Sequence, residues 1–215
     1  MGQSLNKAII FDFDGTLVDS EKAVYQCFQS ITNFIVPERI AYAKNILIGP
    51  PLRDTASEIL GPNHQDQLNE FIKLFIELYD EHAIDNTNPY PGINETLKKL
   101  NEKKVFMAIA TNKRHAPTIK LINHFNWQDY FIFIECSDDK NSIRNKDEMI
   151  QKIIKNNKNF NKAFFIGDTV NDGLSANLSE LPFIKAHYGY GRNQDWTKVN
   201  VKQSIKKPTE ILQLI

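Results

Sequence analysis

The sequence predicts an α/β protein with a doubly wound, mainly parallel sheet of five strands and an inserted helical subdomain. Short apolar runs rich in β-branched or aromatic residues are typical of strands buried on both faces of a parallel sheet. Segments whose apolar residues recur at helical intervals lie between most of these runs, and such alternation is typical of doubly wound folds. The alternation fails between residues 19 and 85, where helical patterns occur without a convincing strand.

The strand prediction depends on five apolar runs, which cover residues 8–13, 105–110, 130–134, 163–166 and 182–186. Three segments between them carry apolar residues at helical spacing: 93–103, 116–125 and 147–155. The first of these helical segments follows Pro91-Gly92, a pair that is typical of a turn.

The segment without strands contains two amphipathic helical patterns, over residues 21–34 and 65–82. Pro50-Pro51 and Gly61-Pro62 interrupt it. We therefore expect a core formed by residues 1–18 and 86–215, and a helical cap formed by residues 19–85.

Composition is that of a globular protein. The chain has 215 residues, 41% of them hydrophobic and 24% charged, and its 26 basic residues balance its 26 acidic ones. This balance argues against a general electrostatic attraction to nucleic acid or to an anionic membrane. Two cysteines cannot form a disulfide framework, and no long apolar stretch indicates a signal peptide or a membrane helix. We expect a cytoplasmic protein.

Two carboxylates follow the first predicted strand, in the sequence Phe11-Asp12-Phe13-Asp14-Gly15-Thr16. In a doubly wound sheet the carboxyl ends of the strands open onto the ligand crevice. Residues two apart on an extended chain share a face, so both side chains can point into that crevice. Close carboxylates repel each other unless a cation or a shared proton is present. The pair therefore indicates a functional site.

A second acidic pair, Asp168 and Asp172, follows the fourth predicted strand. An aspartate at the start of a helix can simply cap it, and this alternative stays open for the pair taken alone. Four acids at two strand ends nevertheless indicate a hard-cation site, since Mg²⁺ prefers carboxylate oxygen. No zinc-type spacing of Cys and His competes with this interpretation.

Two further elements could bind phosphate. Thr111-Asn112 follows the second predicted strand and offers a hydroxyl and exposed backbone N–H groups, although the same residues could form an ordinary turn. Lys146 begins a predicted helix, where a cation opposes the helix macrodipole, so an anion-binding role competes with that of a solvated lysine.

The order of these motifs resembles that of the haloacid dehalogenase superfamily. Asp12-x-Asp14-Gly-Thr comes first, and Thr111-Asn112, Lys146 and Gly167-Asp168-Thr-x-x-Asp172 follow. The helical insert resembles the small α-helical cap of that superfamily. Segments 48–53, 90–92 and 188–191 are similar to those of its phosphoglycolate phosphatase group. The resemblance implies the strand order 5-4-1-2-3, which places the first and fourth motifs side by side.

The resemblance also implies a mechanism. Asp12 would be the nucleophile that forms an aspartyl-phosphate, and Asp14 the acid and base. Mg²⁺ would be bound by Asp12, the backbone carbonyl of Asp14 and Asp168, with Asp172 as a direct or water-mediated ligand. Catalysis and phosphate binding would further depend on Thr111, Asn112 and Lys146.

The cap would select the substrate, and Arg53 is the cap residue that we expect to bind it, with a surface arginine as the alternative. A small phosphorylated metabolite is the expected partner, and phosphoglycolate is the first choice. Lys146 is followed by Asp147-Glu148-Met149, where the phosphoglycolate group usually has prolines. This departure leaves a 5′-nucleotidase or a pyrophosphatase as alternatives within the class.

Two rivals come from other classes. A sugar phosphomutase, similar to β-phosphoglucomutase, would pass the phosphoryl group to a sugar phosphate instead of to water. A non-catalytic binding protein could use the same fold, because a fold does not determine a function. We expect a monomer or a homodimer, and no nucleic acid or membrane as a partner.

Overall fold

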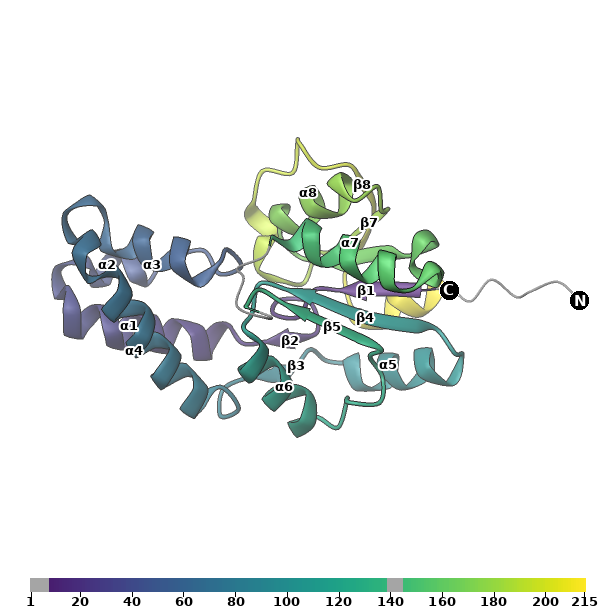
Figure 1. Ribbon diagram of the computed structural model, residues 1–215, viewed down its shortest axis with the longest axis horizontal. Coiled ribbons are helices and arrows are strands. Elements are labelled where there is room, and N and C mark those ends of the chain that lie inside the picture. Colours follow the sequence, from purple (N-terminus) through teal and green to yellow (C-terminus); the bar gives the residue numbers. More distant parts are fainter. Residues whose placement is uncertain (1–7, 139–144) are drawn as a thin grey trace, which may run out of the picture.

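The computed structural model describes residues 8–138 and 145–215. Residues 1–7, on which part of the signal-peptide expectation falls, lie outside the described residues. Six strands form one parallel sheet in the order β5-β4-β1-β6-β7-β8 (Figure 1). Their bounds are β1 Ala8–Phe11, β4 Phe106–Thr111, β5 Phe133–Cys136, β6 Phe164–Gly167, β7 Phe183–Ala186 and β8 Val201–Ile205. The five predicted strands therefore lie in the predicted order.

The fold class is confirmed, and the sheet has one strand, β8, beyond the five predicted. β8 was missed because its sequence, Val-Lys-Gln-Ser-Ile, contains no apolar run, and its three central residues are exposed. β8 pairs only with β7 in the sheet, so it is an edge strand, and most of its residues are not buried. The first strand is also shorter than expected, so Asp12 lies just beyond its end.

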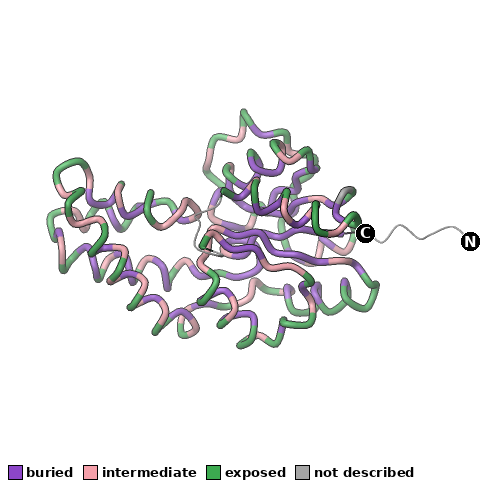
Figure 2. The backbone as a smooth tube through the Cα atoms, in the orientation of Figure 1, coloured by how far each residue is buried: buried purple, intermediate pink, exposed green. Residues whose placement is uncertain are grey.

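Alternation along the central strands produces two apolar layers, and Figure 2 shows that these strands are largely buried. Ile9 and Phe11 of β1 pack in one cluster with residues of α5 (Ile93–Glu102) and α6 (His115–His124). Ala8 and Ile10 pack in another cluster, together with residues of α7 (Lys146–Asn156) and α8 (Val170–Leu178). Successive side chains of a strand point to opposite faces, so both faces of this sheet are covered by helices.

A helical insert follows the first strand. Its helices are α1 (Glu21–Ile35), α2 (Ile40–Ala43), α3 (Leu52–Leu60) and α4 (Leu68–His82). They share a separate apolar cluster, in which Phe28 of α1 meets Phe75 of α4. Two short antiparallel strands, β2 (Val18–Asp19) and β3 (Asn88–Pro89), join the insert to the rest of the chain. The limits at residues 18/19 and 85/86 stay a prediction.

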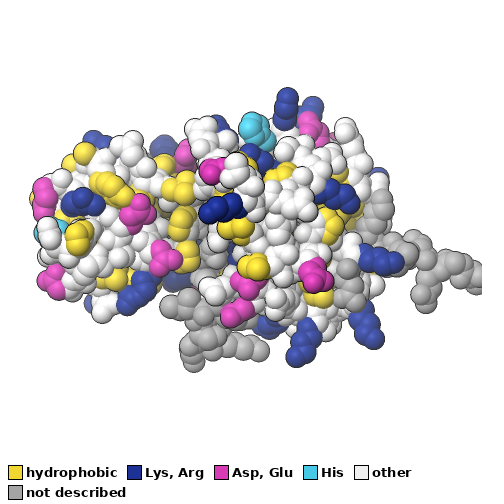
Figure 3. All heavy atoms as spheres, turned by 90° about the horizontal axis from the view of Figure 1, so that it is seen from above, with side chains coloured by type: hydrophobic (Ala, Val, Ile, Leu, Met, Phe, Trp, Pro, Cys, Tyr) yellow, Lys and Arg dark blue, Asp and Glu magenta, His cyan; other side chains and the backbone are white. Residues whose placement is uncertain are grey.

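The other elements of the described residues are short 3₁₀ helices: Pro37–Arg39, Pro62–Gln67, Lys158–Lys162, Tyr190–Asn193 and Pro208–Gln213. No helix within residues 8–138 and 145–215 has the length and apolar character needed to cross a membrane. Acidic and basic side chains are mixed on the face shown in Figure 3, in keeping with the zero net charge of the chain.

Candidate functional site

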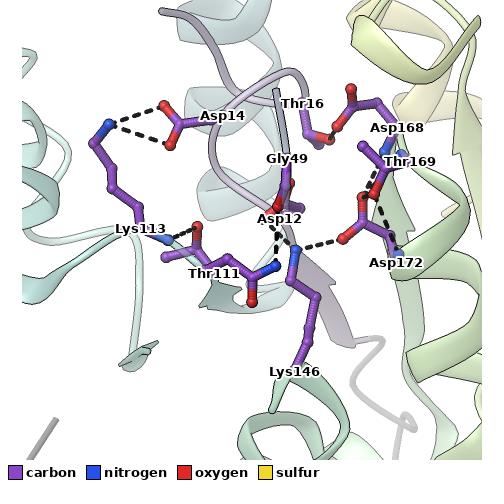
Figure 4. Close-up of polar contacts among 11 residues, drawn as sticks. Asp12, Asp14, Thr16, Gly49, Thr111, Lys113, Lys146, Asp168, Thr169 and Asp172 are labelled. Carbon is purple, nitrogen blue, oxygen red and sulfur yellow. Dashed lines mark hydrogen bonds and ion pairs between the residues drawn. The ribbon is translucent and has the colours of Figure 1, made fainter. Parts of the chain in front are cut away.

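The predicted motifs meet at the carboxyl ends of three neighbouring strands. Asp12 follows β1, Thr111 ends β4, and Asp168 follows β6 (Figure 4). Lys146, the first residue of α7, reaches the same place. This arrangement follows from the strand order, because β4 and β6 both pair with β1.

The loop after β1 turns sharply at Gly15. The Asp12 N–H donates to the carbonyl of Ile166 at 2.8 Å, which keeps this residue aligned with β6. Gly15 has φ +84°, and a Cβ atom there would lie 2.3 Å from Oδ2 of Asp168. Glycine meets both demands, since it adopts positive φ without strain and lets the backbone approach the carboxylate closely.

Asp12, Asp168 and Asp172 form a buried acidic cluster. Their nearest carboxylate oxygens all lie within 4.8 Å of one another. Burial, and then the charge of Asp172, raise the pKa of Asp12 to about 7, against the opposing effect of Lys146. Burial and the charges of Asp172 and Asp12 also raise the pKa of Asp168 well above its ordinary value. Burial and mutual repulsion therefore make the ionised form of these carboxylates unfavourable, and a bound cation would offset both effects.

Lys146 supplies positive charge to this cluster. Its Nζ donates to Oδ1 of Asp12 at 2.8 Å and also donates to Oδ1 of Asp172. Burial lowers the pKa of Lys146, but the two carboxylates outweigh this effect and hold the pKa above its ordinary value. Lys146 is thus a buried ammonium group, and the solvated alternative does not describe it.

Asp172 has two tasks. Its Oδ2 accepts hydrogen bonds from the N–H and the hydroxyl of Thr169, at 2.9 and 2.7 Å, and so completes a capping box at the start of α8. Its Oδ1 meets Lys146. The two interpretations of this residue are therefore compatible, because each uses a different oxygen.

Asp14 points away from the acidic cluster. Its carboxylate accepts from the Lys113 Nζ at 3.0 and 3.1 Å and from the Ser20 hydroxyl at 2.6 Å. Lys113 also donates to the hydroxyl of Tyr79 on α4. The sequence does not identify Lys113 or Ser20 as site residues. Lys113 directly follows the Thr111-Asn112 motif, but the sequence does not show that its side chain or that of Ser20 reaches Asp14, because both contacts depend on the fold.

Residues 112–114 all contact the helical insert. The Asn112 side chain donates to the carbonyl of Gly49 at 3.0 Å, and Lys113 meets Tyr79. Arg114 forms an ion pair with Asp80 of α4. Thr111 lies buried just before them, and its hydroxyl accepts from the Lys113 N–H at 3.1 Å. The predicted Thr111-Asn112 pair therefore lies at the contact between sheet and insert.

The segment 188–191 forms hydrogen bonds with Asp168 and with the loop after β1. The Tyr190 N–H donates to Oδ2 of Asp168 at 2.6 Å, and the Tyr188 hydroxyl donates to the Thr16 carbonyl at 2.9 Å. The Thr16 hydroxyl donates to Oδ1 of Asp168 at 3.3 Å. We had noted the tyrosines only as part of a resemblance, and these contacts show that they position Asp168.

The structure does not bring Arg53 to the site. Its guanidinium donates to Oδ1 of Asn69 at 3.1 and 3.3 Å, in an exposed position. Arg53 is not among the residues that line the cavity beside Asp12. The alternative that we left open, a surface arginine, describes its position.

A cavity lies between the strand ends and the insert. It contains about 690 Å³ of space not filled by atoms, including the solvent at its mouth. Its floor is polar and comprises Asp12, Asp14, Thr111, Asn112, Lys113 and Lys146. Its roof comes mainly from α1, α3, α4 and the segment before α3. The structure brings seven of the eight predicted site residues together. Asp12, Asp14, Thr111, Asn112 and Lys146 line the cavity, and Asp168 and Asp172 cluster with Asp12.

The acidic cluster suits a divalent cation. Carboxylate oxygens are the ligands that Mg²⁺ and similar hard ions prefer. The three carboxylates converge in a buried place, and Lys146 is the cation that faces them among the described residues. The side chain of Asp14 is engaged elsewhere, so only its backbone carbonyl stays a proposed ligand.

Comparison with known proteins agrees with the arrangement of the motifs. Residues 9–186 match the family model of haloacid dehalogenase-like hydrolases. The chain is 26% identical over 196 residues to a phosphoglycolate phosphatase of Agrobacterium fabrum, covering 86% of this chain and 82% of that protein. It is 24% identical over 192 residues to the pyrophosphatase PpaX of Halalkalibacterium halodurans, covering 88% and 87%.

A solved structure shows the same fold. A haloacid dehalogenase-like family hydrolase from Streptococcus pneumoniae superposes with a TM-score of 0.81 at 22% identity, and the match covers 99% of both chains. The family model spans all four motifs, from Asp12 to Asp172. The resemblance noted in the sequence is thus confirmed, and the chain belongs to the haloacid dehalogenase-like hydrolases.

Proposed function

We propose that the protein is a Mg²⁺-dependent phosphomonoesterase that acts on a small phosphorylated metabolite through an aspartyl-phosphate on Asp12. The observation that carries this proposal is the position of Asp12. Its carboxylate lies on the cavity floor, beside a buried lysine and two further carboxylates, while Asp14 lines the same cavity from a separate place. The two relatives described above support phosphate chemistry, because both are named for the removal of phosphate.

In the proposed first step, a carboxylate oxygen of Asp12 attacks phosphorus and forms a new O–P bond. The bond from phosphorus to the leaving oxygen breaks, and Asp14 gives that oxygen a proton. In the second step Asp14 takes a proton from water, whose oxygen attacks phosphorus and displaces the Asp12 carboxylate. Ser20 and Lys113 hold the Asp14 carboxylate in the cavity, and thereby fix the position of this acid and base.

Phosphate oxygens would meet Thr111, the backbone of Asn112 and Lys146, which line the cavity around Asp12. Donors that are already in place stabilise developing charge without reorganisation. Asp12, Asp168 and the Asp14 carbonyl would hold Mg²⁺, with Asp172 as a direct or water-mediated ligand. Bound Mg²⁺ would screen the anionic nucleophile from the anionic phosphate.

The helical insert, residues 19–85, is proposed to be the cap that covers this reaction. Phosphoglycolate was the first choice from the sequence, and pyrophosphate is the second candidate, favoured by the likeness to PpaX. We place the protein in the cytoplasm, as a monomer or a homodimer.

The test is release of inorganic phosphate from phosphoglycolate, nucleotides, sugar phosphates and pyrophosphate, in Mg²⁺ and in EDTA. The proposal predicts Mg²⁺-dependent release from at least one of them. Absence of release from every compound, at enzyme concentrations that suffice for relatives, would contradict it. Faster interconversion of sugar phosphates than phosphate release would identify a mutase instead.

Mg²⁺ should raise the thermal stability of the protein, because it binds the folded acidic cluster and has no such site on the unfolded chain. At a concentration 100 times the dissociation constant, the gain is about 2.7 kcal/mol in the free energy of unfolding. Differential scanning fluorimetry in MgCl₂ and in EDTA measures this effect, with NaCl at equal ionic strength as the control. Asp168→Asn should abolish the response, and a response that survives in this variant would place the ion elsewhere.

Replacement of Arg53 by Gln should leave kcat/KM within about twofold of the parent value. Its guanidinium hydrogen-bonds to exposed Asn69 and does not line the cavity beside Asp12. Steady-state kinetics with the preferred ester measure this. A rise in KM of tenfold or more would show that Arg53 binds substrate, as the sequence had suggested.

A further inference from the structure

The cavity roof differs sharply from its floor. Val24 and Phe28 of α1, Ile48, and Phe75 and Tyr79 of α4 all line the roof, and all are buried. The rings of Phe28 and Phe75 lie 4.5 Å apart between centroids, and those of Phe75 and Tyr79 stack at 5.4 Å. The part of the cavity that faces away from Asp12 is therefore an apolar and largely aromatic surface.

The cations of the cavity already have acidic partners. Lys113 is paired with Asp14, Arg114 with Asp80, and Lys146 with Asp12 and Asp172. Within residues 8–138 and 145–215, no other lysine or arginine lines this cavity. A second anionic group on a substrate would displace one of these pairs or lie unpaired against the apolar roof.

The polar roof groups are also engaged. The hydroxyl of Thr55 donates to the Pro51 carbonyl at 3.3 Å, and the hydroxyl of Tyr79 accepts from Lys113. A carboxylate buried without a partner costs several kcal/mol, whereas an apolar group gains free energy from the same burial. The roof therefore favours an uncharged, apolar leaving group over an anionic one.

We propose that the leaving group of the substrate is an uncharged alcohol with an apolar or aromatic face. This inference rests on the proposed phosphomonoesterase activity and specifies its substrate class. The phosphate would occupy the polar floor beside Asp12, and the alcohol portion would pack under Phe28 and Phe75. Phosphoglycolate and pyrophosphate, whose leaving groups are anionic, fit this roof less well than a neutral ester does.

Two matched esters test the proposal: 4-carbamoylbenzyl phosphate and 4-carboxybenzyl phosphate. They have nearly the same size, and the methylene group insulates the leaving oxygen from the ring substituent. They differ in the charge of the ring substituent that would contact the roof, which is neutral in the carbamoyl ester and negative in the carboxyl ester. We expect kcat/KM in Mg²⁺ to be at least about tenfold higher for the carbamoyl ester, since an unpaired buried charge costs more than 1.4 kcal/mol.

A variant supplies the missing charge. Leu52, the first residue of α3, lines the cavity and is only partly buried, so Leu52→Arg places a guanidinium at the roof. It should lower the ratio of carbamoyl to carboxyl turnover by about tenfold or more. Leu47→Arg is the matched control, because Leu47 is exposed and does not line this cavity. This control should keep the parent ratio.

The outcomes separate the two proposals. Equal turnover of the esters by the parent protein, or faster turnover of the carboxyl ester, would overturn the inference and leave the phosphatase activity standing. An unchanged ratio in a Leu52→Arg protein that melts cooperatively would overturn it as well. Absence of phosphate release from these esters and from the wider panel would overturn the proposed function, and the inference with it.

Discussion

Asp12→Asn should abolish phosphate release, with a fall in kcat of about 10⁴-fold or more, because the amide cannot act as the nucleophile. The fold should persist, since Lys146 keeps Asp172 as a partner. The variant also removes the buried charge of Asp12, whose pKa is raised by burial and then by repulsion from Asp172. Phosphate release under single-turnover conditions measures the first effect, and urea unfolding measures the second.

Asp129→Asn is the matched control for this variant, because Asp129 is an exposed aspartate between α6 and β5. It should keep the parent rate. An Asp12→Asn protein with more than a tenth of the parent kcat would show that another group attacks phosphorus. Trapping of radioactive phosphate on acid-quenched parent protein, and its loss in the variant, would identify the covalent step directly.

Lys146→Met should be the most destabilising change at the site. It leaves Asp12 and Asp172 buried without their lysine partner, and removal of one partner from a buried ion pair costs about 3–5 kcal/mol. Loss of a group that neutralises phosphate should also lower kcat by about 10²–10³-fold. Urea unfolding in EDTA measures the stability, and the same experiment in Mg²⁺ should recover part of the loss.

Lys155→Met controls for the loss of a lysine from α7, since Lys155 is exposed in the last turn of the same helix. Its effect on unfolding should stay within about 0.5 kcal/mol. Equal losses for Lys146→Met and Lys155→Met would contradict the electrostatic role of Lys146, because burial and the carboxylate partners distinguish the two positions.

Periodicity and strand-end chemistry predicted much of the sheet. The four central strands, β4, β1, β6 and β7, carry apolar runs that are mostly buried, and such runs leave a strong signal in the sequence. β8 left no such signal, since an edge strand exposed over its central residues can be polar. Asp12, Thr111 and Asp168 were found because strand ends converge wherever a parallel sheet forms. Lys146 was found as a cation at the start of a predicted helix.

The partners of these residues could not be predicted in the same way. Lys113 lies 99 positions from Asp14, and Ser20 meets Tyr190 across 170 positions, so their contacts depend on how the insert packs on the sheet. Arg53 shows the opposite case. Its chemistry suits an anion, but its direction is set by the rotation of α3, which carries it toward Asn69. Side-chain chemistry alone does not determine where a side chain points.

The contacts of residues 112–114 with the helical insert limit how freely the insert can be replaced by that of a related protein. Three consecutive residues, which follow directly after Thr111, meet Gly49, Tyr79 and Asp80. An insert transplanted from a relative would lose these partners unless the receiving sheet brought its own matching tripeptide. The helical insert and residues 112–114 must therefore be exchanged together, although some sixty positions separate Gly49 from Asn112 along the chain.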